Sequence, residues 1–335
     1  AAGTGVFGVG LFAAPVPGPK RVKAGAESLG AGLFGAGGAW LAGAPLALDA
    51  GAFSMGAAAY GVGVLDASGD GAELASGLDS QGFGFTRGAG LFVYRGSGAR
   101  LDCGLRTPDA HEDLALTSLC QGAGVGPRAF AGGGVGTALV EGSSVSLNAS
   151  YMAQGVGYWH GLGVLVVRGD RDRLQARRYA QGTGVHTALG LLSIEGSSDT
   201  TRVWGVGPAF GWDWGVGWTV VSGDGDRLAS EWAAARGDLN GEGFLTVRGD
   251  HARLALADAG AGAMRRNAPS WAVLAARGTD DVLNAPTPDA WGTVEGFSFD
   301  PDLKAEPADW PRVDRSSAAK ADEERFTGLL RAAGG

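Results

Sequence analysis

A repeat of about 27 residues runs through most of the chain, and this period limits the fold more than any other feature. Nine glycines mark equivalent points of the repeat, and most are the second residue of a Gly-x-Gly pair: Gly10, Gly37, Gly63, Gly90, Gly136, Gly163, Gly190, Gly217 and Gly243. Successive anchor glycines are 26 or 27 residues apart, except for one interval of 46 residues that indicates an insertion. A tenth copy, without the glycine pair, continues through residues 271–278. A fixed period of this length is typical of repeat architectures.

Each repeat contains the same short elements. Four mostly apolar residues follow the anchor glycine, as at 164–167 and 218–221. A turn glycine comes six residues after the anchor, and a leucine follows five residues later in most copies. These segments predict two or three short strands per repeat, separated by turns in which glycine allows a positive φ.

The strand and turn lengths exclude most repeat folds. Ankyrin and tetratricopeptide repeats need helices for which the glycines leave no room, and propeller blades need about 40 residues each. Leucine-rich repeats need a Leu-x-x-Leu-x-Leu frame that is absent here. Hexapeptide solenoids have a repeat of six residues, and a period of 27 is not a multiple of six. The remaining architecture is an all-β parallel β-helix of about ten coils, with one repeat per coil and a spacing of about 4.8 Å.

The predicted β-helix covers residues 1–285 and carries the insertion at 105–133. After it, five prolines indicate an extended stretch, and Ser316 or Ser317 is a suitable first residue for a helix that runs to Arg331. Residues 286–335 are therefore expected to cap the C-terminal coil. The first coil already begins at Gly8, so we expect its uncapped edge to bind a protein partner or a second copy.

In residues 1–285 the chain resembles the bacterial right-handed parallel β-helix superfamily, the pectate-lyase-like solenoids. Residues 179–182 read Tyr-Ala-Gln-Gly and are followed by Gly217 and by Gly-Asp-Gly-Asp at 223–226, as in glycine-rich members of that superfamily. The resemblance implies a right-handed helix. The resemblance does not indicate an activity, because such solenoids include lyases, hydrolases, adhesins and structural rods.

Composition excludes several classes of protein. The 335 residues are 45% hydrophobic and 19% charged, unlike a disordered chain. The 62 glycines do not recur at every third position, as collagen requires. The net charge of −8 argues against nucleic acid as a partner, because nucleic-acid binding needs a basic face. No apolar run approaches the length of a membrane span, so an integral membrane protein is not expected.

Stacked coils place equivalent residues in columns. Residues two and four positions after the anchor, such as Leu165 and Val167, are expected to fill the core together with the leucine of the second strand. Residues five positions after the anchor alternate in charge and predict a surface ion ladder: Arg95, Glu141, Arg168 and Glu195. The side-chain amides that close four consecutive coils are expected to hydrogen-bond along the axis: Gln81, Gln121, Gln154 and Gln181.

Cys103 and Cys120 flank the longer part of the insertion. A pair that brackets an inserted loop predicts a disulfide closing that loop. A disulfide would place the protein in an oxidising compartment, which means the periplasm, the cell surface or the medium. His111 is the only histidine near the pair, so these cysteines make a poor metal site, and no metal or other cofactor is expected.

Gly-Asp turns at 169–172, 223–226 and 278–281 leave calcium as an alternative cofactor. Calcium rolls use tandem nonapeptides, so that two neighbouring turns share each ion, whereas here the turn occurs once per repeat. Aspartate as an ordinary turn residue is the simpler interpretation.

Aromatic and histidine side chains gather just before the anchor glycines of the fifth to eighth coils. This Trp/His corner is the candidate binding surface and consists of Trp159, His160, His186, Trp212, Asp213 and Trp214. The side chains could simply cover a corner of the β-helix, or bind a polysaccharide or a protein through exposed indoles. A third interpretation makes His160, His186 and Asp213 metal ligands or acid–base groups.

No catalytic residue is assigned. The resemblance implies that lyases of this shape combine several carboxylates with a basic residue in a groove, whereas these columns hold one aspartate and no Arg or Lys. The sequence favours an exported, non-catalytic structural or binding solenoid in a cell-envelope or extracellular assembly. The alternative is a polysaccharide-binding or polysaccharide-degrading β-helix that acts at the Trp/His corner.

Overall fold

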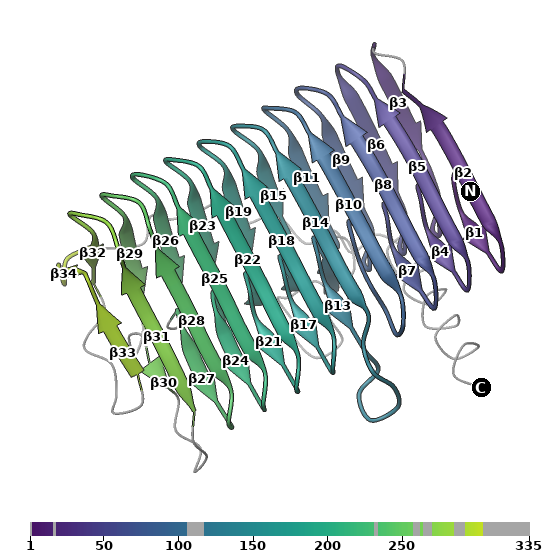
Figure 1. The fold of residues 1–335 in the computed structure, drawn as a ribbon. Helices are drawn as coiled ribbons and strands as arrows, with labels where there is room; N and C mark the ends of the chain where they lie inside the picture. Colours follow the sequence, from purple (N-terminus) through teal and green to yellow (C-terminus); the bar gives the residue numbers. More distant parts are fainter. Residues whose placement is uncertain are drawn as a thin grey trace.

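The computed structural model describes residues 2–15, 18–105, 117–230, 234–256, 262–263, 270–284 and 292–303. These residues form an all-β parallel solenoid of about nine turns, with about 27 residues per turn. Figure 1 shows the coils stacked side by side along one axis. The predicted fold class is confirmed, whereas the helix expected from Ser316 or Ser317 to Arg331 lies outside the described residues.

Three sides make up each coil. Sheet 1 has eleven strands: β2 (Val9–Ala14), β5 (Ala36–Ala42), β8 (Val62–Ser68), β10 (Ala89–Arg95), β14 (Val135–Glu141), β18 (Leu162–Arg168), β22 (Leu189–Glu195), β25 (Val216–Ser222), β28 (Glu242–Val247), β31 (Trp271–Ala276) and β33 (Gly292–Glu295). Sheet 2 has eleven shorter strands: β3 (Lys20–Lys23), β6 (Leu46–Ala50), β9 (Glu73–Ser76), β11 (Arg100–Cys103), β15 (Ser146–Asn148), β19 (Arg173–Ala176), β23 (Thr200–Val203), β26 (Arg227–Ser230), β29 (Arg253–Leu256), β32 (Val282–Leu283) and β34 (Ser298–Phe299).

The third side consists of very short strands. Sheet 3 comprises β1 (Gly5–Val6), β4 (Gly32–Leu33) and β7 (Ala58–Ala59), then β13 (Gly124–Val125), β17 (Gly157–Tyr158), β21 (Gly184–Val185), β24 (Phe210–Trp212), β27 (Arg236–Asp238) and β30 (Gly262–Ala263). Isolated bridges through Gly84 connect the two groups. A further small sheet holds β12 (Thr117–Cys120), β16 (Tyr151–Ala153) and β20 (Arg178–Ala180).

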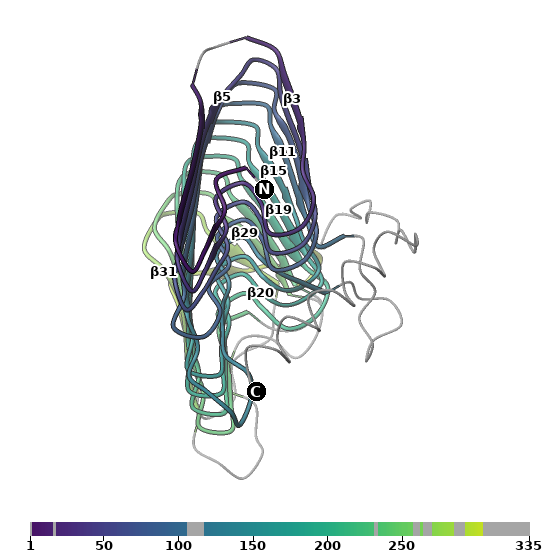
Figure 2. The same cartoon turned by 90° about the vertical axis from the view of Figure 1, so that its right-hand side faces the viewer.

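The coils are right-handed. In Figure 2 the stack recedes from the viewer, with sheet 1 on the left (label β5) and sheet 2 on the right (label β3). In each coil the chain runs up sheet 1 and passes clockwise over the top to sheet 2, for example from β2 to β3. The two terminal strands β33 and β34 pair in parallel with β31 and β32, so the strand pairing continues beyond residue 285. Within the described residues, no helix is long and apolar enough to cross a membrane.

Sheet 1 keeps the predicted register. Arg95 pairs with Glu141, Glu141 with Arg168, and Arg168 with Glu195 on adjacent strands. The ion ladder is confirmed by distances of 3.1 Å from Arg95 Nε to Glu141 Oε2 and 2.9 Å from Arg168 Nε to Glu195 Oε2. Asp66 extends the ladder, because its Oδ1 lies 2.6 Å from Arg95 Nη1.

The core contains both the predicted apolar columns and the predicted amide ladder. Leu165, Val167 and Leu174 are completely buried, since alternate residues of each strand face the interior. The buried glutamines donate from Nε2 to Oε1 of the glutamine one coil earlier, at 3.0–3.1 Å. A buried amide is costly unless it is hydrogen-bonded, so the ladder allows this polar column to line the core.

The anchor glycines lie where sheets 1 and 3 touch through their backbones. A Cβ added to Gly163 would lie 2.1 Å from the carbonyl oxygen of Val156, and one added to Gly157 would lie 2.3 Å from that of Leu189. Figure 2 shows the consequence as the narrow lower part of each coil, below the broad part that holds the core. Close packing of two backbones therefore explains the glycine repeat that defines the period.

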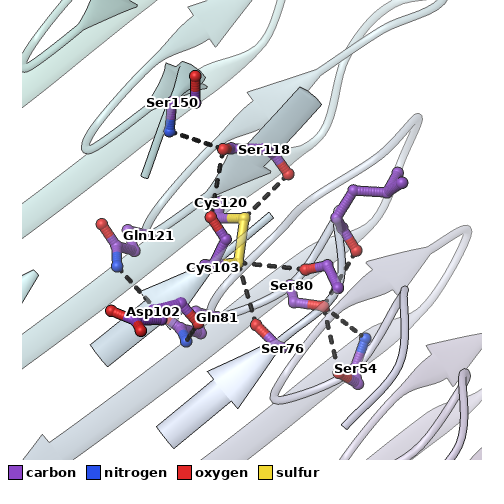
Figure 3. The surroundings of a disulfide bond; sticks show 12 residues. Ser54, Ser76, Ser80, Gln81, Asp102, Cys103, Ser118, Cys120, Gln121 and Ser150 are labelled. Atoms are coloured by element: carbon purple, nitrogen blue, oxygen red, sulfur yellow. Dashed lines mark hydrogen bonds between the residues drawn. A yellow bond between two sulfur atoms is a disulfide. The ribbon is translucent and has the colours of Figure 1, made fainter. Parts of the chain in front are cut away.

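Cys103 and Cys120 are buried, and their sulfurs lie 2.11 Å apart, at the predicted disulfide distance (Figure 3). Ser76 Oγ donates to Cys103 Sγ at 3.1 Å, and Ser118 Oγ donates to the Cys103 carbonyl at 3.2 Å. Residues 106–116 of the insertion lie outside the described part of the chain. Its second part forms the loop between β13 and β14, which projects from the stack in Figure 1.

Candidate binding surface

The Trp/His corner lies at the turns that connect sheet 3 to sheet 1. Strands β17, β21 and β24 run into turns that contain two consecutive non-glycine residues with positive φ: Trp159 and His160, His186 and Thr187, Asp213 and Trp214. Such backbone is uncommon outside glycine, and no glycine marks these positions in the sequence. Stacking holds the turns in place, since His160 N–H donates to His186 O at 3.2 Å and Thr187 N–H to Asp213 O at 2.9 Å.

His186 is the buried centre of the corner. Its side chain is 8% exposed, and its ring centroid lies 5.6 Å from those of both Trp159 and Trp212. Its Nδ1 lies 2.6 Å from Asp213 Oδ2 on the next coil, so a carboxylate fixes the orientation of the imidazole. The packing accounts for His186, Trp159 and Trp212 as side chains that cover the corner.

His160 and Trp214 instead line a shallow groove of about 440 Å³. Trp214 is 64% exposed. Four of the other lining residues are apolar and form one column at the start of sheet 1 strands: Val135, Leu162, Leu189 and Val216. The structure therefore divides the predicted set into an aromatic cluster, in which the half-buried Trp159 and Trp212 pack against the buried His186, and an open groove beside Trp214.

Arg128 is a corner residue that the sequence analysis missed. Its guanidinium carbon lies 5.9 Å from the ring centroid of Trp159, a cation–π distance. Arg128 also contacts Tyr158, whose pKa is raised by burial and lowered in part by this arginine. It belongs to the loop between β13 and β14, so an analysis of repeat columns could not place it at the corner.

A second feature is the burial of a column of aspartates at the glycine turns, two of which lie in the turns at 169–172 and 223–226 that the sequence pattern indicated. Asp172, Asp199 and Asp226 occupy equivalent positions on three consecutive coils, and all three are buried. Burial raises the pKa of Asp199 to about 7 and the pKa values of Asp172 and Asp226 to about 6. Each Oδ1 accepts a backbone N–H from the preceding coil, at 2.7–2.9 Å.

The exposed aspartates of the same turns also bind backbone. Asp170 Oδ1 accepts the Ser197 N–H at 2.9 Å, and Asp224 Oδ1 accepts the Asp250 N–H at 2.9 Å. These bonds support the interpretation of aspartate as a turn residue. Among the described residues, no group of three or more His, Cys, Asp or Glu side chains has an arrangement that would hold a metal ion.

In comparisons with known proteins, the chain matches no protein-family model, no curated protein and no solved structure.

Proposed function

We propose that this chain is a non-catalytic β-solenoid that works through its surfaces, as a structural or binding subunit of an exported assembly in the cell envelope or outside the cell. The buried cysteine pair at disulfide distance supports an oxidising compartment. The likeness to pectate-lyase-like solenoids enters this proposal as a shared rigid architecture, without their chemistry.

The observation that carries the proposal is a contrast between the two long sheets. The outward residues of sheet 2 are largely charged or polar, for example Glu73, Arg100, Asn148, Arg173 and Gln175. The outward residues of sheet 1 are largely apolar. The same repeat builds both sheets, so folding does not require an apolar outer face, and a contact with another molecule explains it better.

Polysaccharide binding at the groove is the second candidate. It is favoured by the exposed indole of Trp214 beside His160, because an exposed indole can stack on a sugar ring. In this alternative Arg128 and Trp159 would form a second part of the same site.

Calorimetry with a panel of acidic and neutral oligosaccharides, together with chromatography of the incubated sugars, distinguishes the two candidates. We expect neither saturable binding nor turnover. Saturable binding that disappears in a Trp159→Ala/Trp214→Ala variant and persists in a Trp271→Ala variant would refute the proposal. Trp271 is a suitable control because it is 52% exposed and lies on β31, outside the corner.

A further inference from the structure

Sheet 1 presents a continuous apolar face to the outside. The face consists of the outward residues one position before, one after and three after the anchor, on the ten strands from β2 to β31. Of these thirty positions, five carry polar side chains: Asp66, Thr137, Ser193, Glu242 and Thr246. Several large side chains are well exposed, including Leu11 at 68% and Trp218 at 43%.

Nothing in the described part of the chain crosses this face, which is turned toward the viewer in Figure 1. Strands of parallel sheets with nearly continuous apolar sequence are normally covered on both sides. One side of sheet 1 is covered by the core, through residues such as Leu165 and Val167. Among the described residues, therefore, nothing covers the outward side, with residues such as Val164 and Val166, although its sequence is suited to a cover.

The apolar face together with its charged border has the size of a stable protein interface. Ten strands at about 4.8 Å span about 45 Å, and the six residue steps from one before to five after the anchor, at about 3.3 Å each, give a width of about 20 Å. The product is about 900 Å², which matches the roughly 800 Å² that each partner contributes to a standard interface. The apolar positions alone span four steps and cover about 600 Å², the upper end of the largest apolar patch on a typical monomer.

We infer that the apolar face binds a second copy of this chain, face to face, about a two-fold axis that runs parallel to the strands between β14 and β18. This inference rests on the proposed function and names the partner and the surface. Five of the ten strands lie on each side of this axis, so β14 faces β18 of the second copy, and β10 faces β22. An interface of this kind requires a self-complementary surface.

The charged border of the face provides that complementarity. Arg95, Glu141, Arg168 and Glu195 follow one another on β10, β14, β18 and β22. Rotation about the axis places Arg95 opposite Glu195 and Glu141 opposite Arg168, so each of these four charges meets its opposite. The arginine side chains are about half exposed, so they have donors for a partner across a sheet separation of about 10 Å.

The apolar positions agree with the same axis. On β5, the indole of Trp40 lies over Gly38, where an added Cβ would be 2.7 Å from the ring, and the rotation places Phe244 of β28 opposite this position. Val64 likewise faces Trp218, and Leu91 faces Leu191. The midpoint of the four alternating charges and the midpoint of the ten strands lie on the same axis. Binding of a partner with an unrelated sequence would not require this coincidence.

Light scattering on the full chain after size-exclusion chromatography tests the inference. We expect a mass of twice 33.7 kDa. Val164→Glu places an ionised carboxylate in the dry centre of the interface and should raise the dissociation constant about 100-fold or more. The control Gln175→Glu, an outward position of sheet 2 on the same coil, should change it less than about 3-fold. Circular dichroism confirms that both variants fold.

A crosslink tests the register. Leu91 and Leu191 of one copy are separated by three strand spacings, about 14 Å, whereas the two-fold places them opposite each other across the interface. A Leu91→Cys/Leu191→Cys variant should form a covalent dimer with a bismaleimide that spans about 8–10 Å, and neither single variant should do so.

A monomeric wild-type chain at about 100 μM would overturn the inference, whichever molecule then covers the face. So would a dimer that Val164→Glu leaves intact, since the second copy would then bind elsewhere, for example at the edge strand β2. Neither result bears on the oligosaccharide experiment, which judges the proposed function separately.

Discussion

The buried aspartate column predicts a stability that increases as the pH falls from 8 toward 4, and Asp199 provides the sharpest test. Its carboxyl is buried, and its Oδ1 accepts the backbone N–H of Asp172 at 2.7 Å. Among the described residues, Oδ2 is buried with no hydrogen-bond partner. Within the described part of the chain, the side chain therefore has one good acceptor contact, and no cation stabilises a negative charge on it.

The size of the effect follows from the pKa. Burial raises the pKa of Asp199 from 3.8 to about 7, and each unit corresponds to about 1.36 kcal/mol. A shift of this size corresponds to a cost of up to about 4 kcal/mol for ionising Asp199 in the folded state. Because the folded pKa is higher than the unfolded one, this stability is fully present below about pH 4, declines as the pH rises, and is lost above about pH 7.

Asp199→Asn keeps the Oδ1 acceptor and removes the charge. We expect the variant to be more stable than the wild type by up to about 4 kcal/mol at pH 8, and to differ by less than about 1 kcal/mol at pH 4. Urea unfolding followed by far-UV circular dichroism at pH 4, 6 and 8 measures the difference. Asp70→Asn is a matched control, because Asp70 is exposed but its Oδ1 likewise accepts a backbone N–H of an adjacent coil, at 2.8 Å from Ser97 N.

The control should change the stability by less than about 1 kcal/mol. If the difference between Asp199→Asn and the wild type is the same at pH 4 and pH 8, the buried carboxyl is not the titrating group and the reasoning fails.

Three further predictions concern the packing. Gly163→Ala should destabilise the protein by several kcal/mol, because its Cβ would lie 2.1 Å from a backbone oxygen, and the loss should be seen as a lower Tm. The control Gly132→Ala should have little effect, because a Cβ at that position meets no atom within 4 Å. Gln154→Leu should lower the free energy of unfolding, measured in urea, by about 1–3 kcal/mol, because Gln121 and Gln181 each lose a buried hydrogen bond. An unchanged free energy of unfolding would mean that the amide ladder does not stabilise the fold. Thiol titration of the unreduced, denatured chain should find no free thiol, and replacing Cys103 and Cys120 by serine should cost about 3 kcal/mol; two free thiols would contradict both the pairing and the proposed compartment.

The sequence by itself determined the parts of this protein that depend on the period. In a parallel solenoid, residues one repeat apart become neighbours in adjacent coils, so a linear spacing translates directly into a column. That rule was enough to predict the register of Arg95 with Glu141, the burial of Leu165, and the hydrogen bond between Gln154 and Gln181. Cys103 and Cys120 were predictable for a related reason, because they bracket an interruption of the period.

Only the tertiary structure decided what depends on contacts between different sides of a coil or on residues outside the repeat. The direction of each side chain at the corner follows from left-handed turns that no glycine marks, so the separation of His186 from Trp214 was not readable in advance. Arg128 reaches Trp159 from an insertion that has no column. The anchor glycines set the period, but their cause, the backbone contact between sheets 1 and 3, is a property of the folded cross-section. The same holds for the pKa of Asp199, since burial depends on how neighbouring turns pack and a sequence column records only which residues are stacked.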